Sequence, residues 1–168
     1  MAGRTERKAP RPGRGLLCKE HAHIGYVTND MDRALAILGE RYGIKRVSFI
    51  EGPMPQGGQI KVAFAWAGGQ IYEVITASGP GTEFYNDSLP KGEFALRFHH
   101  LGFIIHDDAG WRALEHELKA DGWPIAYSTL TGNFIDAYYV KAPELGHYVE
   151  YVRPFQAGVD FYAAVPEN

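Results

Sequence analysis

The feature that most constrains this chain is an internal repeat with one fixed offset. Residues 23–30 are echoed by residues 100–107, and residues 69–75 are echoed by residues 146–152. Both pairs are separated by the same 77 residues (100 − 23 and 146 − 69). Chance could supply either match alone, but a shared offset between two independent matches indicates duplicated modules of equal internal length.

Each module is predicted to fold as a βαβββ unit. An apolar strand opens each module and ends in an aspartate that can cap the next helix, Asp30 or Asp107. The helical faces expected to pack on the sheet are Met31, Ala34, Leu35, Leu38 and Tyr42 in the first module, and Trp111, Leu114 and Leu118 in the second. Three strands are expected after each helix, at residues 46–51, 60–66 and 70–76, and at residues 125–128, 134–141 and 147–152.

This order of elements divides the chain into five parts. The expected parts are a flexible basic tail (1–18), a first module (19–76), a connecting loop (77–98), a second module (99–154) and a C-terminal tail (155–168). The loop is rich in Gly, Pro, Ser and Asp, with a helical turn near Phe84 and Tyr85.

Composition excludes several classes of protein. A hydrophobic content of 45% is enough to bury an interior, and a net charge of −3 gives no footprint for nucleic acid over the body of the chain. No apolar run could span a bilayer, and the basic start lacks the hydrophobic segment of a secretory signal. We therefore expect a cytoplasmic protein that binds neither nucleic acid nor membrane. Cys18 is the only cysteine, so a metal would need nitrogen and oxygen ligands.

Two carboxylates lie on apolar strands at equivalent positions of the two modules. Side chains alternate along a strand, which places Glu73 and Glu150 among apolar neighbours such as Ile71. Burying an unpaired carboxylate is costly unless a cation compensates its charge. Each module also opens with a histidine, His23 or His100. Two imidazoles and two carboxylates balance a divalent ion, so the repetition predicts one metal site formed by all four residues.

The remaining histidines are interpreted as structural. Alternation along the strands places His99 and His147 on the face opposite to His100 and Glu150, so both are expected to face away from the site. His106 lies near a strand end and His116 on a helix. His21 shares the parity of His23 and is the candidate substitute ligand.

The pattern resembles the vicinal oxygen chelate superfamily, which includes glyoxalase I, methylmalonyl-CoA epimerase, extradiol dioxygenases, and bleomycin and fosfomycin resistance proteins. The resemblance covers about residues 19–154 and depends on residues 23–25, 71–73, 99–102 and 146–150. It implies an α+β fold in which two tandem βαβββ modules form a curved, barrel-like, eight-stranded mixed sheet around a metal site. The implied ligands are His23, Glu73, His100 and Glu150.

The ligand set narrows the expected reaction within that superfamily. Extradiol dioxygenases resemble a pattern of two histidines and one carboxylate on Fe(II), and four protein ligands leave less room for that chemistry. Four ligands are similar to the pattern of glyoxalase I and of methylmalonyl-CoA epimerase, which has Gln where this chain has Glu73. The His99-His100 doublet and the short connecting loop favour the epimerase branch, although no basic cluster for a coenzyme A phosphate is evident.

The resemblance implies proton transfer at a carbon beside a carbonyl group. Glu150 is the preferred base, opposed by Glu51 or Glu73. Glu51 shares one face of its strand with Phe49 and Val47, and this face is compatible with an inward direction. The alternative is that Glu51 opens an exposed loop. Seven aromatic residues could line an apolar pocket or belong to the core: Tyr26, Phe64, Trp66, Tyr72, Phe103, Tyr138 and Tyr148.

The expected function is that of a metal-dependent isomerase or epimerase, or a glyoxalase-type lyase, acting on a small carbonyl substrate through a metal-stabilised enolate. The cofactor would be one divalent ion of Zn, Ni, Co, Mn or Fe, and a homodimer is one candidate assembly. Two alternatives stay open. One is a small-molecule binding protein of the resistance type, metal-free or metal-assisted, and the other is an extradiol dioxygenase.

Overall fold

The computed structural model of the protein describes residues 15–168. The first module contains β1 (Glu20–Thr28), α1 (Met31–Tyr42), β2 (Ser48–Pro53), β3 (Gln59–Ala67) and β4 (Gln70–Ser78). The short helix α2 (Glu83–Asn86) connects it to the second module. That module contains β5 (Leu96–Ile104), α3 (Asp108–Ala120), β6 (Ile125–Leu130), β7 (Ile135–Ala142) and β8 (His147–Pro154), and α4 (Gln156–Ala163) follows it.

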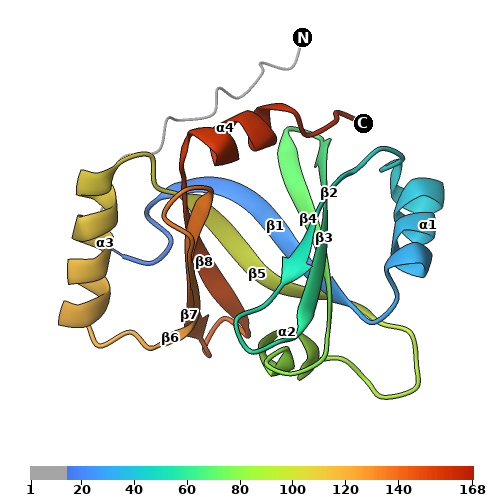
Figure 1. Ribbon diagram of the computed structural model, residues 1–168, viewed down its shortest axis with the longest axis horizontal. Coiled ribbons are helices and arrows are strands. Elements are labelled where there is room, and N and C mark those ends of the chain that lie inside the picture. Colours follow the sequence, from blue (N-terminus) through green and yellow to red (C-terminus); the bar gives the residue numbers. More distant parts are fainter. Residues whose placement is uncertain (1–14) are drawn as a thin grey trace, which may run out of the picture.

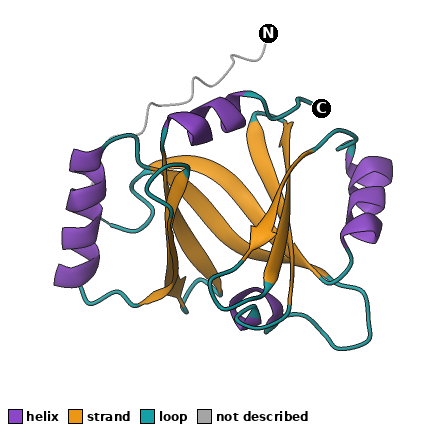
Figure 2. Cartoon of the chain, viewed as in Figure 1, coloured by secondary structure: helices purple, strands orange, loops and turns teal. Residues whose placement is uncertain are grey.

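The strands form one curled mixed sheet with the order β2-β3-β4-β1-β5-β8-β7-β6. In each module the first strand pairs in parallel with the last, β1 with β4 and β5 with β8. The two modules join where β1 pairs antiparallel with β5. Figures 1 and 2 show α1 and α3 outside the curled sheet and α4 across one end. The predicted α+β fold, two βαβββ modules forming a curved eight-stranded mixed sheet, is confirmed.

The two long helices begin at the aspartates that the sequence indicates. The side chain of Asp30 accepts a hydrogen bond from the Arg33 N–H, and that of Asp107 accepts one from the Gly110 N–H. Under α3, Trp111, Leu114 and Leu118 are buried as predicted, and under α1 the same holds for Met31 and Ala34, with Leu35 and Leu38 packed beside them. The prediction for Tyr42 is wrong. It is 68% exposed because it lies in the last turn of α1 and projects past the sheet.

The C-terminal residues were expected to form a tail, and the structure instead places α4 there. Phe161 and Tyr162 of α4 pack against the apolar cluster that contains Phe64, with ring centroids 5.1 and 6.1 Å from that of Phe64. The chain end is held as well, since the Asn168 N–H donates to the Trp66 carbonyl at 2.9 Å. Apolar residues at 155–165 therefore complete the core at one end of the sheet.

Most of the expected basic tail lies outside the described residues, but its last part is ordered on α3 and β8. The Tyr151 hydroxyl donates to the Leu16 carbonyl at 2.7 Å, and Lys19 forms an ion pair with Glu117 at 2.9 Å. The Gly15 N–H also donates to Glu117. Residues 15–18 therefore belong to the body of the protein. None of the helices between residues 15 and 168 is both long and apolar enough to cross a membrane.

Candidate metal centre

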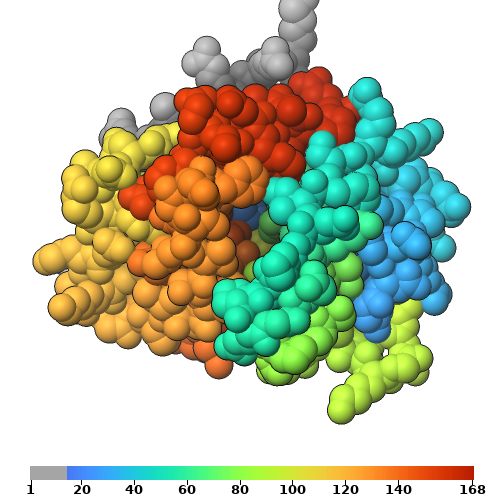
Figure 3. Space-filling view, viewed as in Figure 1, coloured from blue at the N-terminus to red at the C-terminus, as the bar shows by residue number. Residues whose placement is uncertain are grey.

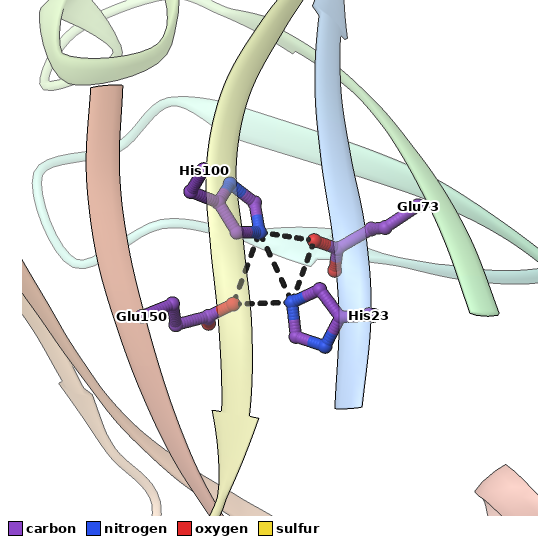
Figure 4. Close-up of side chains that lie close together, drawn as sticks. All are labelled: His23, Glu73, His100 and Glu150. Atoms are coloured by element: carbon purple, nitrogen blue, oxygen red, sulfur yellow. Dashed lines mark hydrogen bonds and ion pairs between the residues drawn. The ribbon is translucent and has the colours of Figure 1, made fainter. Parts of the chain in front are cut away.

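The structure brings the four predicted ligands together at the middle of the curled sheet. His23 lies on β1, Glu73 on β4, His100 on β5 and Glu150 on β8. All four residues are at least 93% buried, and one ligand atom from each lies within 4.8 Å of the others. Figure 4 shows the four side chains pointing toward one another.

The distances between these atoms suit a single small cation. The Nε2 atom of His23 lies 3.0 Å from Nε2 of His100, 2.6 Å from Oε2 of Glu150 and 3.5 Å from Oε2 of Glu73. The Nε2 atom of His100 lies 2.9 and 3.1 Å from the same two carboxylate oxygens. A metal ion about 2.1 Å from each ligand holds neighbouring ligand atoms about 3.0 Å apart in octahedral geometry and about 3.4 Å apart in tetrahedral geometry.

Strand register explains why these side chains converge. Gly25 on β1 pairs with Glu73 on one side and with His100 on the other, so these three residues form one row across the sheet. Gly102 on β5 likewise pairs with His23 and with Glu150 and forms a second row. In each row a glycine separates a carboxylate from an imidazole, and no side chain stands between them.

Both glycines are sterically required. A Cβ atom built on Gly25 would lie 1.9 Å from Cε1 of the His100 ring, and one built on Gly102 would lie 2.2 Å from Cε1 of the His23 ring. Each glycine thus makes room for the histidine of the other module. The repeated His-x-Gly segment therefore encodes a crossed arrangement that neither module can form alone.

Electrostatics in this cluster favour a bound cation. Burial alone would lower the pKa of His100, but the carboxylates of Glu150 and Glu73 raise it to about 9. Burial alone would raise the pKa of Glu150, but the positive charges of His23 and His100 lower it. Oε2 of Glu73 is buried and lies 2.9 Å from Nε2 of His100, but it accepts no hydrogen bond of good geometry from the described residues. A divalent ion would balance the two carboxylates and coordinate that oxygen, so the residues fit such an ion.

The prediction that His99 faces away from the site is wrong, because β5 contains a bulge. Gly25 pairs with His100 and Tyr26 pairs with Phe98, which leaves His99 as the extra residue. His99 is buried, and its Nδ1 lies 2.9 Å from Nδ1 of His100. Its Nε2 lies 3.2 Å from the Phe84 carbonyl. One tautomer satisfies both contacts, in which His100 donates to His99 and His99 donates to the backbone.

The first module has a bulge at the equivalent position, with a different result. His21 pairs with Phe103 and His23 pairs with Gly102, which leaves Ala22 as the extra residue. Ala22 offers no acceptor, and Nδ1 of His23 is buried without a hydrogen-bond partner among the described residues. A ligand histidine is normally oriented by a hydrogen bond from its second ring nitrogen. The two modules therefore differ in how firmly each histidine is held.

The other predicted histidines lie away from the cluster. His21, the expected substitute ligand, is exposed and contacts Oε1 of Gln70 through Nδ1 at 2.7 Å. His106 pairs with Glu20 at the surface, and Nδ1 of His147 lies 2.7 Å from the Tyr148 carbonyl.

The inward direction expected for Glu51 is contradicted by the structure. Val47 packs against the α1 side of the sheet and Phe49 is 44% exposed, so this set of alternating residues faces outward. The side chain of Glu51 is 71% exposed at the rim of the central cavity, with its carboxylate 3.9 Å from Nζ of Lys61. The inward neighbour is Ile50, which packs against the core. Side chains alternate along β2 as predicted, but Phe49 and Glu51 belong to its outward face and not to its inward face.

A cavity of about 260 Å³ opens next to the cluster, and both Glu73 and Glu150 line it. Figure 3 shows a hollow at this place, between β2 and β3 on one side and β6 and β7 on the other. Six aromatic rings line the cavity: Phe64, Tyr85, Tyr127, Phe134, Tyr139 and Tyr162. Of the seven aromatic residues considered from the sequence, Phe64 alone is among them.

Sequence reasoning missed the other five rings. Tyr139 pairs with Glu150 across β7 and β8, a register that becomes visible only once the strands are aligned. Tyr85 lies in the segment between the modules, and Tyr162 lies in α4, where a tail was expected.

Comparisons with solved structures support this fold. A methylmalonyl-CoA epimerase from Mycobacterium tuberculosis is similar with a TM-score of 0.57 and 16% identity, over 90% of this chain and 96% of that chain. A hypothetical protein from Bacillus halodurans has the same TM-score and identity, over 82% of this chain and 96% of its own. A methylmalonyl-CoA epimerase in complex with methylmalonyl-CoA and NH4+ has a TM-score of 0.54 and 16% identity, over 83% and 96% of the two chains.

The TM-scores show a shared fold, so the resemblance predicted from the sequence is confirmed for the fold. No protein-family model matches the sequence, and no curated protein matches it either.

Proposed function

We propose that this protein, which shares its fold with methylmalonyl-CoA epimerases, is a metal-dependent isomerase or epimerase. It would move a proton at a carbon atom beside the carbonyl group of a small molecule. The observation that carries this proposal is the buried cluster of His23, Glu73, His100 and Glu150, whose two carboxylates also line a cavity.

The proposed cofactor is one divalent ion of Zn, Ni, Co, Mn or Fe, held by two imidazole nitrogens and two carboxylate oxygens. Such nitrogen and oxygen donors suit these metals, and a bound ion would act as a Lewis acid that makes the C–H beside a carbonyl group more acidic. His23 and His100 are assigned to binding alone, because both rings are buried and point at the cluster.

The two carboxylates are the proposed proton carriers. Glu150 and Glu73 each direct Oε2 into the cluster, and each has a second oxygen that can accept a proton. They come from β8 and β4, on opposite sides of the central pair of strands, which suits a base and an opposing acid. Glu150 is the proposed base, and Tyr139 is its register partner across β7 and β8. Glu51 has no part in this assignment because its carboxylate is exposed.

Hydrogen exchange in heavy water tests this proposal. The metal-loaded protein is incubated with 2-hydroxypropiophenone, a methylmalonyl thioester and the adduct of a 2-oxoaldehyde with a thiol. We expect deuterium at the carbon beside the carbonyl of at least one compound, without oxygen consumption. Glu150→Gln should slow this exchange about a hundredfold or more, and Glu144→Gln, an exposed glutamate, should leave it unchanged. No exchange with any compound, or oxygen uptake with a catechol, would contradict the proposal.

A further inference from the structure

We propose that the substrate of this site is a small, neutral, aromatic carbonyl compound. This inference rests on the proposed function and specifies the class of molecule that the cavity accepts. Three properties of the cavity carry it: the rings that form its walls, the sign of the charges around it, and its size.

Six aromatic rings contribute to the walls of the cavity, together with aliphatic side chains. On one side Tyr127 lies 5.8 Å from Tyr85 and 6.0 Å from Tyr139 between ring centroids. On the other side Phe64 lies 6.1 Å from Tyr162. Such walls contact a flat ring through edge-to-face and offset arrangements, which add to the gain from burying apolar surface. An aliphatic acyl chain would lack these ring-to-ring contacts.

The charged residues that line the cavity are all acidic. Among the described residues that line it, the charged ones are Glu51, Glu73 and Glu150, and no lysine or arginine is present. The divalent ion of the proposed site would be balanced by Glu73 and Glu150. A carboxylate or phosphate on the substrate would therefore enter the cavity without a positive partner, which is costly. Lys61 is not among the lining residues, and its Nζ is already engaged by Glu51 at 3.9 Å and by the Phe49 ring, 4.6 Å from the ring centroid.

The cavity nevertheless offers donors for a neutral oxygen. Tyr85 and Tyr139, which line the cavity, each carry a phenol hydroxyl group. A phenol O–H can donate to a carbonyl or hydroxyl oxygen of a ligand. The volume of about 260 Å³ is below the range typical of drug-sized ligands, which suits a compound of one ring system.

Two probes of opposite character test the substrate class. The Zn(II)-loaded protein is titrated with 2-hydroxypropiophenone, which is neutral and aromatic, and with the methylmalonyl thioester of N-acetylcysteamine, which is anionic and aliphatic. We expect the aromatic probe to bind at least about tenfold more tightly, which corresponds to about 1.4 kcal/mol. Equal affinities, or tighter binding of the thioester, would overturn the proposal.

Variants of the residues that line the cavity distinguish specific binding from non-specific hydrophobic binding. Tyr127→Leu and Phe134→Leu should each weaken binding of the aromatic probe about fivefold or more and leave zinc affinity unchanged. Tyr42→Leu, a matched change at an exposed tyrosine on α1, should leave both affinities unchanged. Thr129→Lys places a cation in the wall and should improve binding of the anionic thioester. If both wall variants bound the aromatic probe as tightly as the wild type does, the proposed site would be contradicted.

The same experiments distinguish this inference from the proposed function. Deuterium exchange with the thioester alone would mean that the proton transfer is right and the substrate class is wrong. Tight, Tyr127-dependent binding of the aromatic probe without any exchange would mean that the class is right and the reaction is wrong.

Discussion

The ring of His100 lies over the backbone of Gly25, a residue of the other module. The two residues pair across β1 and β5, and a Cβ atom at residue 25 would lie 1.9 Å from the ring. His23 and Gly102 have the same relationship in reverse. The cluster is therefore specified by contacts between the modules, and its four residues depend on the correct pairing of the two central strands.

A methyl group at either glycine should displace the opposing histidine. We expect Gly25→Ala and Gly102→Ala each to weaken zinc binding at least about tenfold, because the ring must leave its place in the cluster. Gly39→Ala on α1 is the matched control, since its Cβ would meet the Ile44 carbonyl at an acceptable 3.4 Å. Equilibrium dialysis measures the affinities, and circular dichroism checks that each variant folds. Native zinc affinity in folded Gly25→Ala protein would contradict the steric argument.

His99 should act as a positioning residue for His100. His99→Phe removes the acceptor that holds the His100 ring and should weaken metal binding about 10- to 100-fold, whereas His99→Asn retains an acceptor and should recover most of the affinity. The visible absorption spectrum of the Co(II) form should change in His99→Phe and resemble the wild type in His99→Asn. A loss of thermal stability with an unchanged spectrum and affinity would indicate a role in packing alone.

Glu51→Gln should have almost no effect on metal content or on proton exchange. Its side chain is 71% exposed and lies on the outward face of β2, so it is not placed to act as the opposing base. Exchange rates for Glu51→Gln within about twofold of the wild type are expected, beside the hundredfold loss for Glu150→Gln. A loss as large as that of Glu150→Gln would show that Glu51 takes part in the proton transfer.

Asp136 should contribute a pH-dependent part of the stability. Its burial alone would raise its pKa, but the Gly132 N–H at 2.9 Å and the Arg153 guanidinium at 2.6 Å lower the pKa below the ordinary 3.8. Because the folded-state pKa is depressed, the stabilisation is complete above about pH 4 and is lost as the pH falls through the folded value. Asp136→Asn should therefore cost about 2 kcal/mol at pH 7.

The check is urea unfolding of both proteins across pH. The difference in free energy of unfolding between the wild type and Asp136→Asn should be constant from about pH 6 to 8 and shrink below about pH 4. A difference that stays the same down to pH 3 would rule out the charge of Asp136 as its origin.

Much of the fold and the cluster of four candidate ligands can be predicted from the repeat alone. A shared offset identifies equivalent positions without any knowledge of the structure, and strand alternation then places Glu73 and Glu150 on apolar faces. Alternation fails where the strand is irregular. The bulge at His99 turns a residue of the wrong parity toward the site, and no local sequence signal marks that bulge.

The cavity could not be predicted for a different reason. Its walls combine residues from β3, β6, β7 and α4 with Tyr85 of α2, which are separated in sequence and meet only when the sheet curls. The sequence shows that the chain is rich in aromatic residues, but it does not show which of them share a space. Alternation also could not tell the outward face of β2 from the inward one, which explains the error at Glu51.

The most direct test of the central claim is the metal content of the purified protein after equilibration with Zn(II), Co(II), Ni(II), Mn(II) or Fe(II). The wild type should hold close to one ion per chain of at least one metal, and so should His21→Ala, which removes an exposed histidine of the same strand. The double variant His23→Ala, His100→Ala should hold almost none while remaining folded. Full occupancy in that double variant, or no tight binding of any of the five metals by the wild type, would contradict the assignment of this cluster as a metal centre.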